Sequence, residues 1–148
     1  MRPLVLGAVA LVCLLGCESG PKLYPVRGKV TLPDGKPVHA GTVTFYPDAA
    51  RGNTSLDLPI GELKADGTYA LASGPKPGAT AGWYKVAVNA AERVHPDDPY
   101  RFTWIGHERY TNPDAAGLAV EVVESPGPTQ YDLTIEPPAA PVAKKGKK

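Results

Sequence analysis

The sequence predicts an all-β protein, a seven-stranded antiparallel β-sandwich, and two observations carry this prediction. Apolar residues recur at every second position in short segments, which is the period of a half-buried strand. The 148-residue chain also contains 16 Gly and 17 Pro, and these residues interrupt helices and favour turns. Since each segment has one apolar face, a single sheet would leave that face in water, so we expect two sheets to pack face to face.

The first two strands are predicted on either side of a turn. In residues 26–32 the smaller or apolar side chains alternate with Arg, Lys and Thr. Residues 33–37, with the sequence PDGKP, predict a tight hairpin turn, because Pro fixes φ and Asp-Gly suits positive φ. In the next strand Val43 and Phe45 alternate with Thr and Tyr.

Further strands are predicted in the middle of the chain. A weaker candidate at residues 60–64 is joined by the hairpin turn Asp66-Gly67 to a strand at residues 68–71. A Gly/Pro-rich loop over residues 73–82 then leads into the strongest candidate, residues 83–88.

The last two strands are predicted at residues 118–123 and 131–136, where Leu, Val, Tyr and Ile again occupy alternate positions. Residues 137–148 consist of Pro, Ala, Lys and Gly with a single Val. Such a composition buries too little apolar area to fold, so we expect a disordered basic tail.

The N-terminus has the features of a signal peptide. Arg2 is followed by a continuous apolar run from Leu4 to Leu15, which is too short to span a bilayer comfortably. A short buried core helix is the alternative interpretation of this run.

The sequence Leu14-Leu15-Gly16-Cys17 resembles the lipobox of bacterial lipoproteins. The resemblance implies that Leu14 and Gly16 are recognised by the signal peptidase and that Cys17 becomes the N-terminus and carries the lipid. Two or three acyl chains, such as palmitate, anchor a protein stably where one does not. An ordinary secretory signal with an incidental cysteine remains the alternative.

The lipobox implies a division of the chain and a location. The expected segments are a lipoprotein signal peptide (1–16), a lipidated tether (17–23), a β-sandwich domain (24–136) and the disordered tail (137–148). Cys13 would be removed with the signal peptide, so no disulfide is expected. We expect the protein in the cell envelope, lipid-anchored on the extracytoplasmic side. Glu18 favours the outer membrane, because Asp at that position resembles an inner-membrane retention signal.

Several strand and turn motifs resemble carboxypeptidase regulatory-like domains, which are transthyretin-like (prealbumin-like) β-sandwiches. Small lipoproteins of the planctomycete type carry one such domain behind a lipobox. The resemblance covers about residues 24–136 and implies a non-enzymatic accessory module without cofactors. The motifs that carry it are residues 26–32, 34–38, 41–47, 66–71, 77–78 and 82–88.

Residues 89–116 depart from that pattern, because they form a longer connection than is usual in compact domains. The aromatic residues of this segment make it the candidate surface for a ligand or partner, since such rings stack on sugars or apolar side chains. The alternative is that they fold back to cover a sheet edge or close the core. These candidate residues are Tyr100, Phe102, Trp104 and Tyr110.

Other chemistry is not favoured by the sequence. His95, Asp97, Asp98, His107 and Glu108 offer metal ligands, but their spacing is irregular, so no metal site is predicted. No nucleophile elbow, P-loop or Rossmann glycine pattern is found, so no catalytic residues are predicted. A net charge of +1 gives no indication of nucleic-acid binding.

The sequence therefore predicts a membrane-anchored, non-catalytic β-sandwich module for structural or protein-interaction roles. Its expected partners are the membrane, through Cys17, and an envelope protein or polysaccharide. The alternative function is a carbohydrate- or small-ligand-binding lipoprotein that uses the aromatic loop 89–116.

Overall fold

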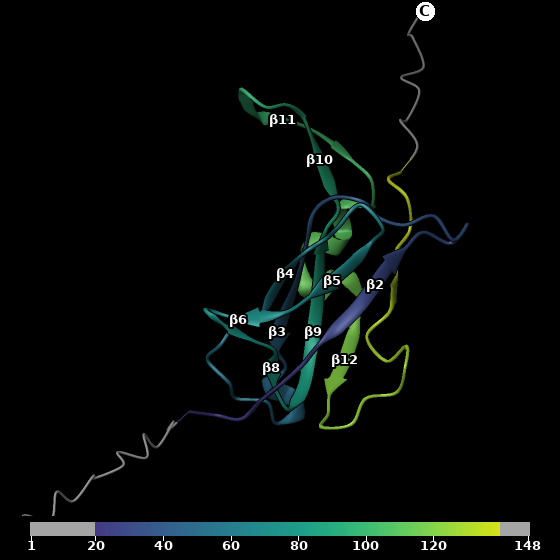
Figure 1. Ribbon diagram of the computed structural model, residues 1–148. Helices are drawn as coiled ribbons and strands as arrows, with labels where there is room; N and C mark the ends of the chain where they lie inside the picture. Colours follow the sequence, from purple (N-terminus) through teal and green to yellow (C-terminus); the bar gives the residue numbers. More distant parts are fainter. Residues whose placement is uncertain (1–19, 140–148) are drawn as a thin grey trace, which may run out of the picture.

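A six-stranded sheet is the largest element of the structure, a computed structural model that describes residues 20–139 (Figure 1). Its strand order is β12-β9-β3-β4-β6-β7, with antiparallel pairing throughout. The long strand β9 lies between β3 and β12 and is the centre of the well-paired half of the sheet. The six strands are β3 (Thr42–Pro47), β4 (Ile60–Glu62), β6 (Ala72–Ser73), β7 (Lys76–Pro77), β9 (Gly82–Asn89) and β12 (Ala119–Val122).

A second sheet has the order β13-β2-β5 and contains β2 (Arg27–Thr31), β5 (Thr68–Ala70) and β13 (Leu133–Thr134). Two further pairs complete the strands. Near the beginning of the described chain, β1 (Leu23–Tyr24) pairs with β8 (Ala79–Thr80). After β9, the chain forms a hairpin of β10 (Ala91–His95) and β11 (Asp98–Trp104).

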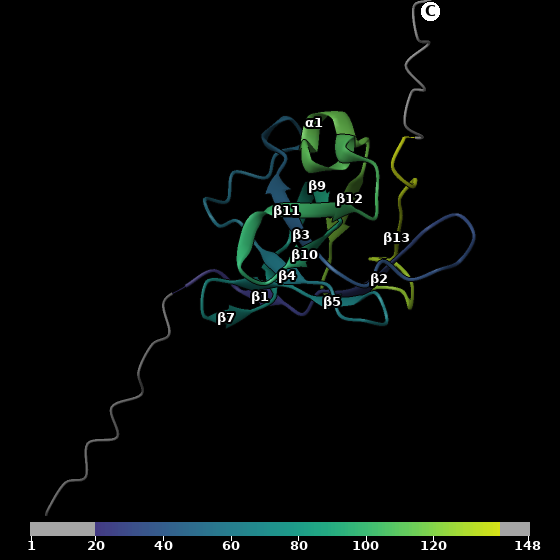
Figure 2. The ribbon, with the colours of Figure 1, turned by 90° about the horizontal axis from the view of Figure 1, so that it is seen from above.

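The two larger sheets share one hydrophobic core. Seen from above, β2 and β5 lie on one side of β3 and β9 (Figure 2). Side chains from both sheets belong to the same buried cluster, which removes the apolar face of each sheet from water. The members of this cluster with 0–1% exposure are Val26, Val30, Val38, Val43, Phe45, Ala79, Tyr84, Val86, Val88, Val122 and Ile135.

Short helical segments close one end of this core. They are the 3₁₀ helix η2 (Glu108–Thr111) and the α-helix α1 (Pro113–Ala116), both of which contact β9. Asn112 caps α1 by accepting a hydrogen bond from the Asp114 amide, and Pro113 occupies the first turn. Another 3₁₀ helix, η1 (Ala49–Arg51), follows β3 and is capped by Asp48.

The predicted all-β class is confirmed in its coarse form, since the described residues are mainly strands with one short α-helix. The alternation of buried and exposed side chains is also confirmed at the strongest positions. In β12, Val120 and Val122 are buried and alternate with exposed residues, and the same alternation holds from Tyr131 to Glu136. In β9, Tyr84, Val86 and Val88 are at most 1% exposed, but Ala87 between them is buried too. The Gly/Pro loop predicted over residues 73–82 instead contributes the short strands β7 and β8.

The pairing of the strands differs from a simple series of hairpins. The turn at residues 33–37 forms as predicted, with Gly35 at a φ of 83°, but the returning chain pairs only briefly, through the bridge between Thr31 and Pro37. It then crosses to the other sheet as β3. The partners of β2 are β5 and β13, and β13 runs parallel to it.

A buried hydroxyl joins the two ends of the second sheet. Tyr69, which is 2% exposed, donates a 2.6 Å hydrogen bond from its hydroxyl to the Tyr131 carbonyl. Burial raises the pKa of the Tyr69 hydroxyl far above its ordinary value, with a smaller contribution from the charge of Asp132. The hydroxyl is therefore protonated, and a donor, at neutral pH.

Replacing Tyr69 with phenylalanine should destabilise the fold by about 1–3 kcal/mol, because the Tyr131 carbonyl would lose its buried donor. Urea unfolding followed by circular dichroism measures this change. Tyr100→Phe removes a hydroxyl from a side chain that is 88% exposed and should leave the unfolding midpoint unchanged. Equal midpoints for the two variants would contradict the importance of the buried bond.

Candidate functional site

The β10–β11 hairpin carries most of the predicted candidate residues and extends beyond the end of the six-stranded sheet (Figure 1). Arg93 lies opposite Phe102 and Ala91 opposite Trp104. Directly opposed residues point to the same side of a two-stranded sheet, and residues two apart in one strand do so too. These four side chains therefore share one face, which we call the aromatic face. Tyr100 lies further along β11, in the stretch where the register of the hairpin shifts.

The aromatic face is open to solvent. Phe102 is 48% exposed, and the neighbouring Tyr100 is 88% exposed. The rings of Phe102 and Trp104 meet edge to face, with centroids 5.0 Å apart and planes at 84°, a favourable arrangement for two aromatic rings. A hollow of about 270 Å³ lies against them, lined also by Asn89, Ala91 and Arg93.

The base of the hairpin is fixed to the core. Both Ile105 and Gly106 donate backbone hydrogen bonds to the Ala90 carbonyl. On the hairpin itself, Glu92 lies 3.3 Å from the His39 ring nitrogen. These contacts position the aromatic face while its outer part remains unobstructed by the rest of the described chain.

Tyr110 has a different role from the other predicted candidates. It is only 4% exposed and belongs to the core cluster. Its hydroxyl accepts hydrogen bonds from Arg109 Nη2 (2.9 Å) and from the Glu136 amide (3.2 Å), and Arg109 also pairs with the Glu136 carboxylate. Tyr110 therefore closes the core between η2 and the C-terminal strand, rather than contributing to an exposed surface. The segment 89–116 thus divides into an exposed hairpin and a covering helical part.

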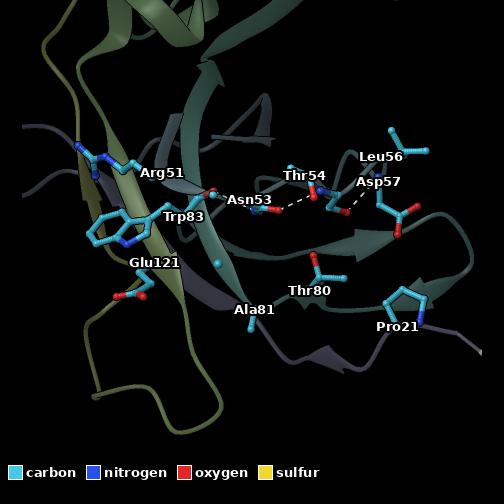
Figure 3. A pocket seen from close by; sticks show the side chains of 13 residues that line it. Pro21, Arg51, Asn53, Thr54, Leu56, Asp57, Thr80, Ala81, Trp83 and Glu121 are labelled. Carbon is cyan, nitrogen blue, oxygen red and sulfur yellow. Dashed lines mark hydrogen bonds between the residues drawn. The ribbon is translucent and has the colours of Figure 1, made fainter. Parts of the chain in front are cut away.

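A groove of about 620 Å³ lies at the other end of β9, and sequence reasoning did not identify it (Figure 3). Trp83 forms one wall, and the Arg51 guanidinium lies 4.5 Å from the centre of its ring, within the range of a cation–π interaction. Arg51 also pairs with Asp48 at 3.5 Å. The lining residues are Pro21, Arg51, Gly52, Asn53, Thr54, Ser55, Leu56, Asp57, Thr80, Ala81, Gly82, Trp83 and Glu121.

The opposite wall of the groove is a loop shaped by its own side chains. Asn53 is 7% exposed and donates to the Trp83 carbonyl at 2.9 Å, while its side-chain oxygen accepts from the Ser55 amide. The Ser55 hydroxyl then accepts from the Asp57 amide at 3.2 Å. The intervening Leu56 is 100% exposed, so this bonding pattern holds an apolar side chain in water.

The described chain begins beside this groove. Pro21 lines it, and Gly20 borders a neighbouring hollow together with Lys76 and Pro77 of β7. The predicted lipobox residues Leu14, Gly16 and Cys17 lie outside the described residues. Within residues 20–139, no helix has the length and apolar character needed to cross a bilayer.

The electrostatics of residues 20–139 are those of surface ion pairs and turns. Hydrogen bonding to Lys36 lowers the pKa of Asp34, and the same interaction with Lys22 lowers the pKa of Glu124. The pKa of Asp66 is lowered because its carboxylate accepts hydrogen bonds from the hydroxyl and the amide of Thr68 within the same turn. Among these described residues, no group of three or more His, Cys, Asp or Glu is arranged to hold a metal ion.

Comparisons with protein-family models, with curated proteins and with solved structures give no significant match for this chain.

Proposed function

We propose that the protein is an extracytoplasmic lipoprotein, anchored in the cell envelope through an acylated Cys17, that presents the aromatic face of its β10–β11 hairpin to another envelope protein. In this proposal the described domain is a non-catalytic β-sandwich of the transthyretin-like class. Its support is the common core of the two main sheets together with the strand and turn motifs.

The observation that carries the proposal is the separation of the hairpin from the beginning of the chain. Gly20 lies near β7 and β8, whereas β10 follows the far end of β9 (Figure 1). The seven residues from Trp83 to Asn89 alone span roughly 20 Å of strand. A lipid at Cys17 would leave the aromatic face directed away from the bilayer, where a partner can reach it.

The composition of the aromatic face fits a protein partner. Exposed aromatic residues beside an arginine are the residue types that dominate protein interfaces, because they bury large areas at low entropic cost. The rigid base of the hairpin also limits the ordering that binding would require.

Replacing Phe102 with serine should reduce crosslinking to the partner in intact cells by at least about tenfold, which corresponds to the loss of one strongly contributing interface residue. Crosslinking followed by mass spectrometry of the captured protein measures this. Arg101→Ser changes the exposed residue that precedes Phe102 in β11 and is the matched control. An unchanged crosslinking pattern in the Phe102→Ser variant would refute the hairpin as the interface.

The second candidate function is carbohydrate binding. The hollow beside Phe102 and Trp104 favours it, because ring faces and the polar groups of Asn89 and Arg93 border the same space. Glycan-array binding by the purified protein that disappears in Trp104→Ala would support this function over a protein partner.

A further inference from the structure

An apolar side chain at the groove beside Trp83 is exposed and is not buried by any other part of the described domain. Leu56 is 100% exposed and Leu58, in the same loop, is 48% exposed. The hydrogen bonds of Asn53 and Ser55 on both sides of Leu56 give the loop a defined conformation. A leucine held outward in this way favours burial against an apolar surface supplied from outside.

The length of chain before Gly20 limits what that surface can be. Three residue steps separate Cys17 from Gly20, so their Cα atoms are at most roughly 11 Å apart. Pro21 and Leu56 line the same groove. A lipid attached to Cys17 therefore brings the bilayer surface within reach of this groove and of its exposed leucine.

The groove is lined by charged groups of both signs, which suits a surface that also carries both signs, such as zwitterionic lipid headgroups. The Arg51 guanidinium stacks on Trp83 at one side, and the carboxylates of Asp57 and Glu121 also line the groove. A guanidinium suits a lipid phosphate, and carboxylates suit a headgroup ammonium. Tryptophan is enriched at the level of lipid headgroups.

We propose that the membrane-facing end of the domain, defined by Pro21, Leu56, Trp83 and Arg51, lies on zwitterionic phospholipid headgroups, with Leu56 inserted between them. This inference rests on the acylation of Cys17 in the proposed function. It adds a fixed orientation: the domain lies against the bilayer by this end instead of moving freely on its tether.

The two tryptophans of the chain give a direct test, because Trp83 lies in the groove and Trp104 lies on the hairpin at the other end. The acylated full-length protein is placed in phosphatidylethanolamine–phosphatidylcholine vesicles with brominated acyl chains, which quench nearby indoles. Trp104→Phe leaves Trp83 as the reporter, and Trp83→Phe leaves Trp104. Trp83 should lose more than about half of its fluorescence, since its ring would lie near the headgroup–acyl boundary, and Trp104 should keep its own.

A second substitution tests the inserted leucine. In the Trp104→Phe background, Leu56→Ser should restore most of the Trp83 fluorescence. Val94→Ser, a change of similar chemistry at a hairpin side chain that is 51% exposed, should leave the quenching unchanged. Because both side chains are exposed, neither substitution disturbs the core.

The outcomes separate the two proposals. The mass of the same sample first establishes whether Cys17 is acylated. Acylated protein with unquenched Trp83, or with both tryptophans equally quenched, overturns the orientation and leaves the lipoprotein proposal standing. An unacylated Cys17 overturns the lipoprotein proposal, and the orientation falls with it.

Discussion

Replacing Gly41 with alanine should destabilise the domain by at least about 3 kcal/mol, which is a large part of the stability of a typical domain. Gly41 has a φ of 126°, a conformation that L side chains rarely adopt, and a Cβ at this position would collide with the backbone carbonyl of Asn89. The carbonyl cannot move away easily, because Asn89 is paired with Thr42 where β3 and β9 meet. Gly41 also accepts a backbone hydrogen bond from Leu63, so the chain is held from both sides.

Thermal unfolding followed by circular dichroism measures this effect, and a decrease in Tm of roughly 10–20 °C is expected for a domain of this size. Gly35→Ala is the matched control. Gly35 also has a positive φ, of 83°, but its Cβ would meet nothing within 4 Å, so only the backbone penalty of about 1 kcal/mol applies. If the two variants unfold at the same temperature, the close approach of β3 and β9 at Gly41 is incorrect.

Replacing Cys17 with alanine should reduce the incorporation of a labelled fatty acid to background in the native cell. The thiol is the group that accepts the lipid, and alanine has no nucleophile to replace it. Gel fluorography of the immunoprecipitated protein measures the incorporation. Cys13→Ala is the matched control, because Cys13 lies in the segment that the lipobox assigns to the signal peptide. Retention of label by Cys17→Ala, or its loss from Cys13→Ala, would contradict the proposed anchor.

Period-two patterns in the sequence were sufficient to locate the strands that bury one face. Phe45, Tyr84 and Val86 are fully buried where alternation places them, because a strand beside a core exposes every second side chain to it. The turns at Gly35 and Gly67 were also predictable, since both glycines have the positive φ that their Asp-Gly sequences suggest.

Strand pairing was not predictable from the same patterns, because alternation defines a face and not a partner. The chain leaves β2 after the bridge between Thr31 and Pro37, and its second sheet is completed by β13 from the other end of the sequence. Strands of two residues, such as β1 and β8, are too short to show any period. They are defined by the pairing of Leu23 and Tyr24 with the β8 residues.

The candidate surfaces were predictable in part. The aromatic composition pointed to Tyr100, Phe102 and Trp104, but residues 89–116 were interpreted as a long loop, and the strands β10 and β11 within them were not predicted. Tyr110 shares the aromatic composition of that segment but lies in the core, because the chain turns through Gly106 into η2. The groove at Trp83 gave no comparable signal, since the exposure of Leu56 depends on hydrogen bonds within an irregular loop.

The intact mass of the protein isolated from its own cells tests the lipoprotein proposal most directly. The proposal predicts a chain that begins at Cys17 and carries the added mass of two or three acyl chains, with residues 1–16 absent. A mass that includes residues 1–16, or a free thiol at Cys17, would contradict it.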